Sequence, residues 1–253
     1  NPFKRVYWLN QGAQSFSIKE CVVAIDIKSD TTWATSFQDR QVNILNGATL
    51  TVSVPMALDT VMMEEDAQVV FTATEGKLTA RSLRFAPLLS ATGWKAFGMP
   101  FTSAVIKNST EEEISAPSTQ NVDNGIWFAR LKDNKTPEFV VDESAFGMAG
   151  LWAANGDTYT ISSEGAFEFK TLEEPAAPTE TGTFLMCSNP NTFTITLKQS
   201  AYILTADGTS FEQEANPEIK PFQSFVLTDA KTLSTLRSLR IGDGVVTGNQ
   251  TIE

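Results

Sequence analysis

Short segments in which apolar and polar residues alternate are the dominant pattern of this chain. Between residues 41 and 54, apolar side chains occupy most second positions on both sides of an Asn-Gly pair. Alternation with a period of two predicts strands that bury one face, and the Gly-containing pair predicts a turn between them. Similar segments follow up to residue 85, each bounded by small or polar residues. The first part of the chain is therefore predicted to be rich in short strands.

Residues 1–92 are predicted to form a β-rich N-terminal domain, and two architectures fit it. One is a small sandwich built from hairpins. The other is a few turns of a parallel β-solenoid, in which each rung contributes a short strand and a tight turn. The frequent turns of residues 46–80 are typical of solenoid rungs, but the segment shows no regular repeat period. The sequence leaves both architectures open.

Residues 93–253 are predicted to form an antiparallel β-sandwich domain. Two of their segments, 159–169 and 202–211, share a Tyr-x-aliphatic start and an acidic residue followed by Gly in the middle. Gly supplies the positive φ of a tight turn, so each segment predicts a β-hairpin. The second, with Asp207-Gly208 at its tip, carries the clearer hairpin signal of the two.

Helical periodicity is scarce. Residues 229–241 place three leucines three residues apart, which favours a helix, but their Ser and Thr content weakens that prediction. One helical turn followed by a strand fits the segment equally well. The predicted fold class is therefore all-β.

Acidic residues outnumber basic ones, with 30 Asp and Glu against 19 Lys and Arg and a net charge of −11. Nucleic-acid binding through phosphates needs a basic surface, so we expect no nucleic-acid partner. Attraction to anionic membrane surfaces is disfavoured for the same reason. No run of 18 apolar residues occurs, so no transmembrane helix is predicted.

Histidine is absent from the sequence. Nucleophilic sites of the Ser-His-Asp and Cys-His types are thereby excluded, as are zinc and non-haem iron sites that use histidine. The two cysteines, Cys21 and Cys187, lie in apolar surroundings and read as buried small hydrophobic residues, with a long-range disulfide as the alternative. We expect no cofactor, no metal site and no catalytic residues.

Three tryptophans of the second half are candidates for stacking on sugar rings. The apolar neighbours of Trp94 and Trp127 favour core packing for both. Trp152 is followed by small and polar residues, so we expect it to reach the surface. Together with Asn155 and Asp157 it forms the candidate ligand-binding set.

Clusters of acidic residues are a second class of candidate site. Asp123-Asn124-Gly125 and Asp207-Gly208 have the oxygen ligands that Ca²⁺ prefers, but their spacing favours ordinary turns. The acidic runs at 64–66 and 111–113 are predicted to be solvated surface. Ser-Lys chemistry and glycoside hydrolysis by a pair of carboxylates remain open without histidine. The sequence places no such carboxylate pair.

Two Pro-Phe pairs, Pro100-Phe101 and Pro221-Phe222, lie near the two ends of the strand signals in the second half. Proline fits a strand at its start, at an edge or at a bulge. Each pair therefore predicts the beginning of an outer strand whose phenylalanine enters the core.

The order of motifs from Trp94 to Phe225 resembles a β-sandwich module of secreted and cell-surface proteins of Bacteroidetes. That module is found, for example, at the C-terminus of BspA-like leucine-rich-repeat surface proteins. The resemblance covers about two thirds of the chain and rests on five motifs: a Trp-led segment ending in Pro-Phe (94–101), a Gly-led aromatic strand (150–161), Gly-Thr-Phe (182–184), a Tyr-x-Leu strand with a Gly turn and a Phe (202–211), and a closing Pro-Phe-x-x-Phe strand (221–225).

The resemblance implies an exported bacterial protein located extracellularly or at the outer-membrane surface. We expect a non-catalytic cell-surface protein that acts in adhesion or binds a ligand, with a glycan or a host or cell-surface protein as partner. A lipid anchor would lie outside this sequence. The alternatives are a glycan-active hydrolase that uses a carboxylate pair and a structural subunit of a surface assembly.

Overall fold

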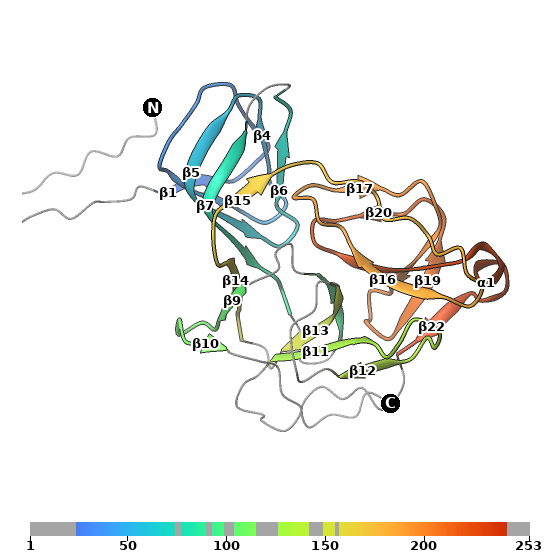
Figure 1. Cartoon of the computed structure of the whole chain (residues 1–253). Coiled ribbons are helices and arrows are strands. Elements are labelled where there is room, and N and C mark those ends of the chain that lie inside the picture. The colour runs from blue at the N-terminus through green and yellow to red at the C-terminus, as the bar shows by residue number, and fades with distance from the viewer. Residues whose placement is uncertain are drawn as a thin grey trace, which may run out of the picture.

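The computed structural model describes residues 24–73, 77–89, 93–98, 104–114, 126–141, 149–154 and 157–241 (Figure 1). Strands account for nearly all regular structure in these ranges, and the one helix there is the short α1 (Ala230–Thr235). The prediction of an all-β fold is confirmed. No helix in the described part of the chain is long and apolar enough to cross a membrane.

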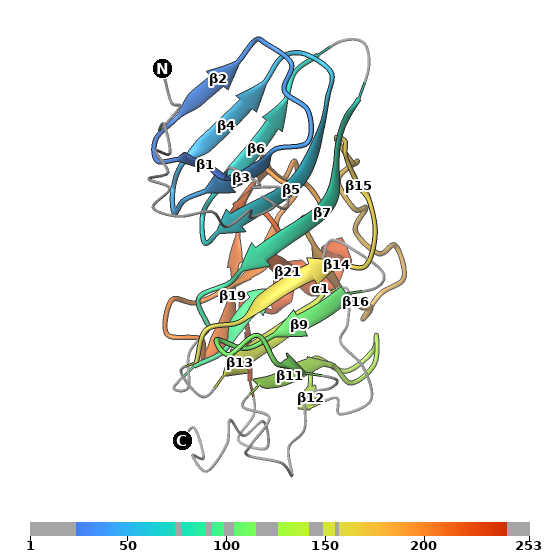
Figure 2. The ribbon, with the colours of Figure 1, turned by 90° about the vertical axis from the view of Figure 1, so that its left-hand side faces the viewer.

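The first 60 or so described residues form a parallel β-solenoid, so the small-sandwich alternative was wrong (Figure 2). One sheet of the solenoid contains four parallel strands: β1 (Ala24–Ile27), β3 (Gln41–Ile44), β5 (Met56–Glu64) and β7 (Leu78–Ala86). The other contains three: β2 (Thr31–Trp33), β4 (Thr49–Val52) and β6 (Gln68–Phe71). Inward-facing Val42, Leu50 and Val61 are buried between the two sheets, as the alternation predicts.

The Asn46-Gly47 turn joins the two sheets of the solenoid instead of forming a hairpin. Gly47 has φ 73°, which a glycine adopts without strain. The strands on either side, β3 and β4, belong to different sheets and each pairs with the next rung. Equivalent positions Ile25, Val42, Val61 and Leu83 are separated by progressively longer stretches of chain, so the sequence shows no fixed period.

Strand β7 belongs both to the solenoid and to an antiparallel sheet. Its free edge pairs with β14 (Thr160–Ser163) and β15 (Phe167–Phe169), both antiparallel. The sheet then continues from β14 to β9 (Ala104–Lys107) and β10 (Glu113–Ile114). Strand pairing therefore crosses the predicted domain boundary at residue 92, and the division into two domains stays a prediction.

The predicted hairpin over residues 159–169 was wrong. Its two halves, β14 and β15, do not pair with each other but follow one another along β7, with Ile161 opposite Phe85 and Phe167 opposite Ala80. The Ser163 hydroxyl donates to the Gly165 carbonyl at 2.8 Å, and it accepts a hydrogen bond from the Leu83 amide of β7. The polar residues between β14 and β15 thus interrupt a strand instead of reversing it.

Two antiparallel sheets of the second half pack face to face and confirm the sandwich prediction (Figure 1). The first has the order β12 (Phe139–Val141), β11 (Ile126–Leu131), β13 (Gly150–Ala154) and β8 (Lys95–Phe97). The second has the order β16 (Phe184–Ser188), β21 (Ser224–Thr228), β18 (Ala201–Leu204), β19 (Ser210–Glu214) and β22 (Ser238–Arg240). A small pair of β17 (Ile195–Thr196) and β20 (Glu218–Ile219) covers the outer face of the second sheet.

The sheet of β11 and β13 is buried on both faces. Phe128 and Trp152 join the core that extends from the solenoid, whereas Trp127 and Leu151 face the sheet of β18 and β21. The chain therefore forms three layers in this region, and the middle layer consists of strands with consecutive buried residues. The prediction of core packing for Trp94 and Trp127 is confirmed, since both are at least 95% buried.

The second sheet contains the predicted hairpin over residues 202–211 and the segment 229–241. Residues 202–211 form the predicted hairpin of β18 and β19, with Gly208 at φ 72°. The segment 229–241 forms one short helix followed by β22, so the alternative to a continuous helix is confirmed.

The prediction of an outer strand after Pro221-Phe222 was wrong, because β21 lies between β16 and β18. The pair precedes the strand, so the missing proline amide disturbs no ladder, and Phe222 enters the core as predicted. Pro100-Phe101 lies outside the described residues.

Candidate functional site

Of the three predicted ligand-binding residues, the structure describes Trp152 and Asp157. Trp152 is fully buried, with its ring 5.5 Å from that of Phe97 and 5.2 Å from that of Phe128, so the prediction that it reaches the surface was wrong. The small residues after it permit close packing of a strand covered on both faces. Asn155 lies outside the described residues.

Asp157 is half-buried, and its carboxylate accepts hydrogen bonds from its neighbour Thr158 and from the distant Ser109. Its Oδ1 accepts from the Thr158 amide at 2.7 Å, and hydrogen bonds from Ser109 and Thr158 hold the pKa of the carboxyl below its usual value. The assignment of Asp157 to a ligand-binding site stays a prediction.

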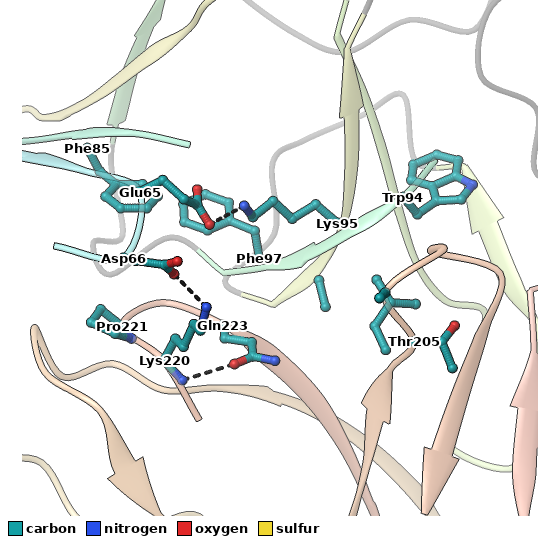
Figure 3. Close-up of a pocket in the computed structure, with 13 residues that line it drawn as sticks. Glu65, Asp66, Phe85, Trp94, Lys95, Phe97, Thr205, Lys220, Pro221 and Gln223 are labelled. Atoms are coloured by element: carbon teal, nitrogen blue, oxygen red, sulfur yellow. Dashed lines mark hydrogen bonds and ion pairs between the residues drawn. The ribbon is translucent and has the colours of Figure 1, made fainter. Parts of the chain in front are cut away.

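A pocket of about 240 Å³ lies where the solenoid meets both sheets of the sandwich (Figure 3). Five segments line it: the β5–β6 turn, the end of β7, the beginning of β8, the β18–β19 turn, and the connection from β20 to β21. Its lining combines charges of both signs with apolar groups: Glu65, Asp66, Phe85, Trp94, Lys95, Ala96, Phe97, Leu204, Thr205, Ala206, Lys220, Pro221 and Gln223.

The β5–β6 turn supplies the two carboxylates of the pocket. Asp66 has φ 59°, a conformation that aspartate tolerates better than most residues, and the turn closes through a hydrogen bond from the Ala67 amide to the Glu64 carbonyl. Glu65 accepts from the Leu88 amide through Oε2 and pairs with Lys95 through Oε1. Only 16% of the Glu65 side chain is exposed, so the prediction that 64–66 is a solvated surface was wrong for this residue.

Lys95 is the first residue of β8 and is 29% exposed. Besides its ion pair with Glu65, its ammonium donates to the Leu88 carbonyl at 3.4 Å. Because an ammonium carries three donors, one remains for a ligand after these two contacts. This pair links the solenoid to the first sheet of the sandwich.

The second ion pair links the solenoid to the other sheet. Lys220 Nζ lies 2.8 Å from Asp66 Oδ1. The Lys220 amide donates to Gln223 Oε1 at 2.9 Å, and the Gln223 amide closes a turn on the Lys220 carbonyl. Pro221 in this turn fixes its own φ, and Phe222 adopts φ 60°. The side-chain oxygen of Gln223 is thus engaged, which leaves its NH₂ group as a donor.

The opposite wall is the β18–β19 turn, which packs closely on the beginning of β8. Asp207 Oδ1 accepts hydrogen bonds from the Thr205 hydroxyl and the Thr209 amide, which shape the turn. A β-carbon at Gly208 would lie 2.6 Å from the Trp94 carbonyl oxygen, so glycine is required there for contact as well as for φ. Figure 3 shows the indole nitrogen of Trp94 directed away from the other pocket residues.

Aromatic side chains close the bottom of the pocket. The rings of Phe85 and Phe97 stack at 5.2 Å, and Phe222 meets Phe85 edge-on at 5.0 Å. All three are at least 97% buried. Phe85 and Phe97 line the pocket and leave little ring surface for a ligand to stack on, and Phe222 packs against Phe85 without lining the pocket. The charged and amide side chains of the lining form the polar rim of the pocket: Glu65, Asp66, Lys95, Lys220 and Gln223.

Sequence reasoning missed every pocket residue as a member of this site. The five lining segments are separated in sequence, and local patterns do not show which segments meet. One signal was present: Lys95 stands between Trp94 and Ala96-Phe97 in an otherwise apolar run. A cation within an apolar strand requires a buried partner, and Glu65 is that partner.

Metal binding has no visible basis at this pocket. Among the described residues, no group of three or more Asp, Glu or Cys side chains is arranged to hold a metal ion. Both carboxylates of the pocket face lysine ammonium groups, which occupy the position that a cation would take.

Comparisons with known proteins supply no relative for this chain. No protein-family model matches it, and neither the curated proteins nor the solved structures show a significant similarity to it.

Proposed function

We propose that this protein is a non-catalytic, cell-surface binding protein and that the pocket between the solenoid and the sandwich holds a glycan. The observation that carries the proposal is the pocket rim, in which two lysine–carboxylate pairs and one amide surround a preformed cavity. Concave sites with a few convergent polar groups over an apolar base are typical of small-ligand binding.

The charges of the rim favour an uncharged, hydroxyl-rich ligand. Glu65 and Asp66 balance Lys95 and Lys220, so a ligand with a net charge would leave one sign of the rim unmatched. A hydroxyl group both donates and accepts, which suits a rim in which ammonium and amide donors stand beside carboxylate acceptors. Sugars present many such hydroxyls on one ring.

The cell-surface location and a role in adhesion rest on the resemblance of residues 94–225 to the Bacteroidetes surface module. An acidic, histidine-free composition agrees with an exposed protein that performs no histidine-based chemistry. Protease treatment of intact source cells tests the location. We expect loss of the full-length protein while a cytoplasmic marker is retained; survival of the protein under conditions that degrade known surface proteins would contradict it.

A glycan hydrolase is disfavoured by how the pocket carboxylates are engaged. Both Glu65 oxygens have partners, one in Lys95 and the other in the Leu88 amide. Asp66 is paired with Lys220. A carboxylate-pair mechanism needs one carboxyl that donates a proton and another that is free to attack or to activate water. Neither role fits these contacts.

Calorimetric titration with a panel of neutral sugars tests the binding proposal. We use glucose, galactose, mannose and N-acetylglucosamine with their short oligosaccharides as probes. At least one should bind the wild type, and Gln223→Ala should weaken its binding about two- to tenfold, the value of one hydrogen bond. Lys198→Ala, an exposed change away from the pocket, is the control. Absence of binding to every probe and to a broad glycan array would overturn the proposal.

A further inference from the structure

We infer that the pocket recognises the terminal ring of a glycan and not an internal stretch of its chain. This inference rests on the proposed function, and it adds which part of the glycan the pocket binds. It follows from the size of the pocket, from the contacts that hold its lining segments in place and from the position of its available polar atoms.

The pocket has room for little more than one sugar ring. Its volume of about 240 Å³ lies below the roughly 300–1,000 Å³ of cavities that hold drug-sized ligands. A site that binds the middle of a chain must accommodate several consecutive rings, and this cavity does not.

The lining residues lie on more than one side of the pocket. Figure 3 shows Glu65, Asp66 and Pro221 on one side and Trp94 and Thr205 on the other, with Lys95 and Gln223 between them. The aromatic group of Phe85 and Phe97 closes the bottom. A single ring placed between these sides can contact both of them.

The walls are held in place before any ligand arrives. Glu65 is tied to β8 through Lys95 and to the Leu88 amide, and Asp66 is tied to Lys220. On the opposite side, Gly208 packs closely against the backbone of Trp94, which holds the β18–β19 turn against the beginning of β8. A preorganised pocket of this kind does not widen to admit a second sugar ring unless these contacts break.

The polar atoms that remain available lie near the opening. Lys220 is 58% exposed and Asp66 is 38% exposed, whereas Glu65 is nearly covered and fully engaged. The NH₂ group of Gln223 and the remaining donors of Lys220 come from one turn. A terminal ring presents adjacent free hydroxyls to such a rim, while an internal ring has one of those positions substituted by the next sugar.

The test compares glycans that carry the same sugar at the chain end or only inside the chain. The wild-type protein is titrated with the monosaccharide that binds best among the four probes, with oligosaccharides that end in it, and with oligosaccharides in which another sugar caps it. We expect affinities within about threefold for the monosaccharide and the uncapped oligosaccharides. Capping should weaken binding more than about tenfold.

Two affinity patterns of the wild-type protein would overturn the inference while leaving glycan binding intact. One is affinity that rises about tenfold or more with each added ring, since this would show contacts to several rings. The other is binding of capped and uncapped chains with equal affinity. Gln223→Ala and Lys220→Ala should both reduce binding of the uncapped chains, and Lys198→Ala should not. If sugars bind but neither pocket variant matters, the ligand lies elsewhere and the inference is wrong. If no sugar binds at all, the proposed function itself fails.

Discussion

The α-carbon of Gly208 packs against the backbone of Trp94, and a β-carbon at position 208 would come within 2.6 Å of the Trp94 carbonyl oxygen and 2.8 Å of its amide nitrogen. Neither backbone atom moves like the end of a flexible side chain. The contact fixes the β18–β19 turn against the beginning of β8 and thereby sets one wall of the pocket.

Replacement of Gly208 by alanine should therefore destabilise the protein through two separable effects. The positive φ of 72° costs an L-residue about 1–2 kcal/mol, and the clash with Trp94 adds about 1–3 kcal/mol. Gly47→Ala is the matched control, because Gly47 has φ 73° and no atom lies within 4 Å of its added β-carbon. Denaturant unfolding should show the larger loss for Gly208→Ala; equal losses would mean that the Trp94 contact has no energetic effect.

The Glu65–Lys95 pair should show a measurable coupling free energy. Lys95→Met leaves a largely covered carboxylate without its ammonium, which costs about 1–3 kcal/mol. The double variant Glu65→Gln/Lys95→Met should be more stable than the sum of the single losses predicts. A double-mutant cycle of unfolding free energies measures this difference.

The exposed pair Lys132–Glu138 provides the comparison for that cycle. Both side chains are about half exposed, at 52% and 51%, so solvent and salt screen the interaction. Its coupling should be close to zero, and smaller than that of Glu65–Lys95 in the same buffer. The reverse order would contradict the assignment of Glu65–Lys95 as the stronger link.

Asp229 should make the stability of the protein depend on pH in the acidic range. The side chain and amide of Thr232, together with the Gly182 and Lys231 amides, donate to this carboxylate and hold its pKa well below the usual value. A carboxyl whose pKa is lower in the folded state stabilises the fold above its unfolded pKa, and this stabilisation is lost as the pH falls toward the folded pKa.

Asp229→Asn tests that linkage. The melting temperature of the variant should be lower than that of the wild type at neutral pH and should approach it as the pH is reduced from 5 toward 2. Asp26→Asn, an exposed change on β1, serves as the control. A constant difference between the wild type and Asp229→Asn over this range would contradict the prediction.

Cys187 should be inert toward thiol reagents in the native protein. Its free thiol is 8% exposed, and burial raises its pKa to about 12, so almost no thiolate forms at neutral pH. In a Cys21→Ser variant, a disulfide reagent should label Cys187 slowly in buffer and rapidly in denaturant. Rapid labelling of the native variant would show that the thiol is accessible.

Local sequence patterns predicted strands well because alternation is a property of the strand itself. The hairpin of β18 and β19 was predicted because Asp207 and Gly208 shape its turn without help from the rest of the chain. The solenoid was harder to recognise, since its rungs differ in length and the repeat has no constant period. The prediction of a hairpin at 159–169 failed because both of its strands pair with β7, which lies far away in the sequence.

The candidate site was missed for a related physical reason. Trp152 and the residues after it read as a surface segment because small residues are common in loops, but here they allow a strand to be covered on both faces. The pocket depends on Glu65, Lys95 and Lys220 coming together from three parts of the chain. Its ion pairs are tertiary contacts, and each segment of sequence contains only one of the two residues of a pair.

Strand β7 pairs with the solenoid on one edge and with β14 and β15 on the other. The two halves of the chain therefore cannot unfold independently at this end of the solenoid. In an isolated solenoid, terminal rungs can melt one at a time because each contacts only its neighbours. Here the last rung cannot fray alone, since β7 also pairs with β14 and β15, and Phe85 packs on Phe97 and Phe222. A fragment cut at residue 92 would carry a bare, hydrogen-bonding strand edge and would be prone to self-association.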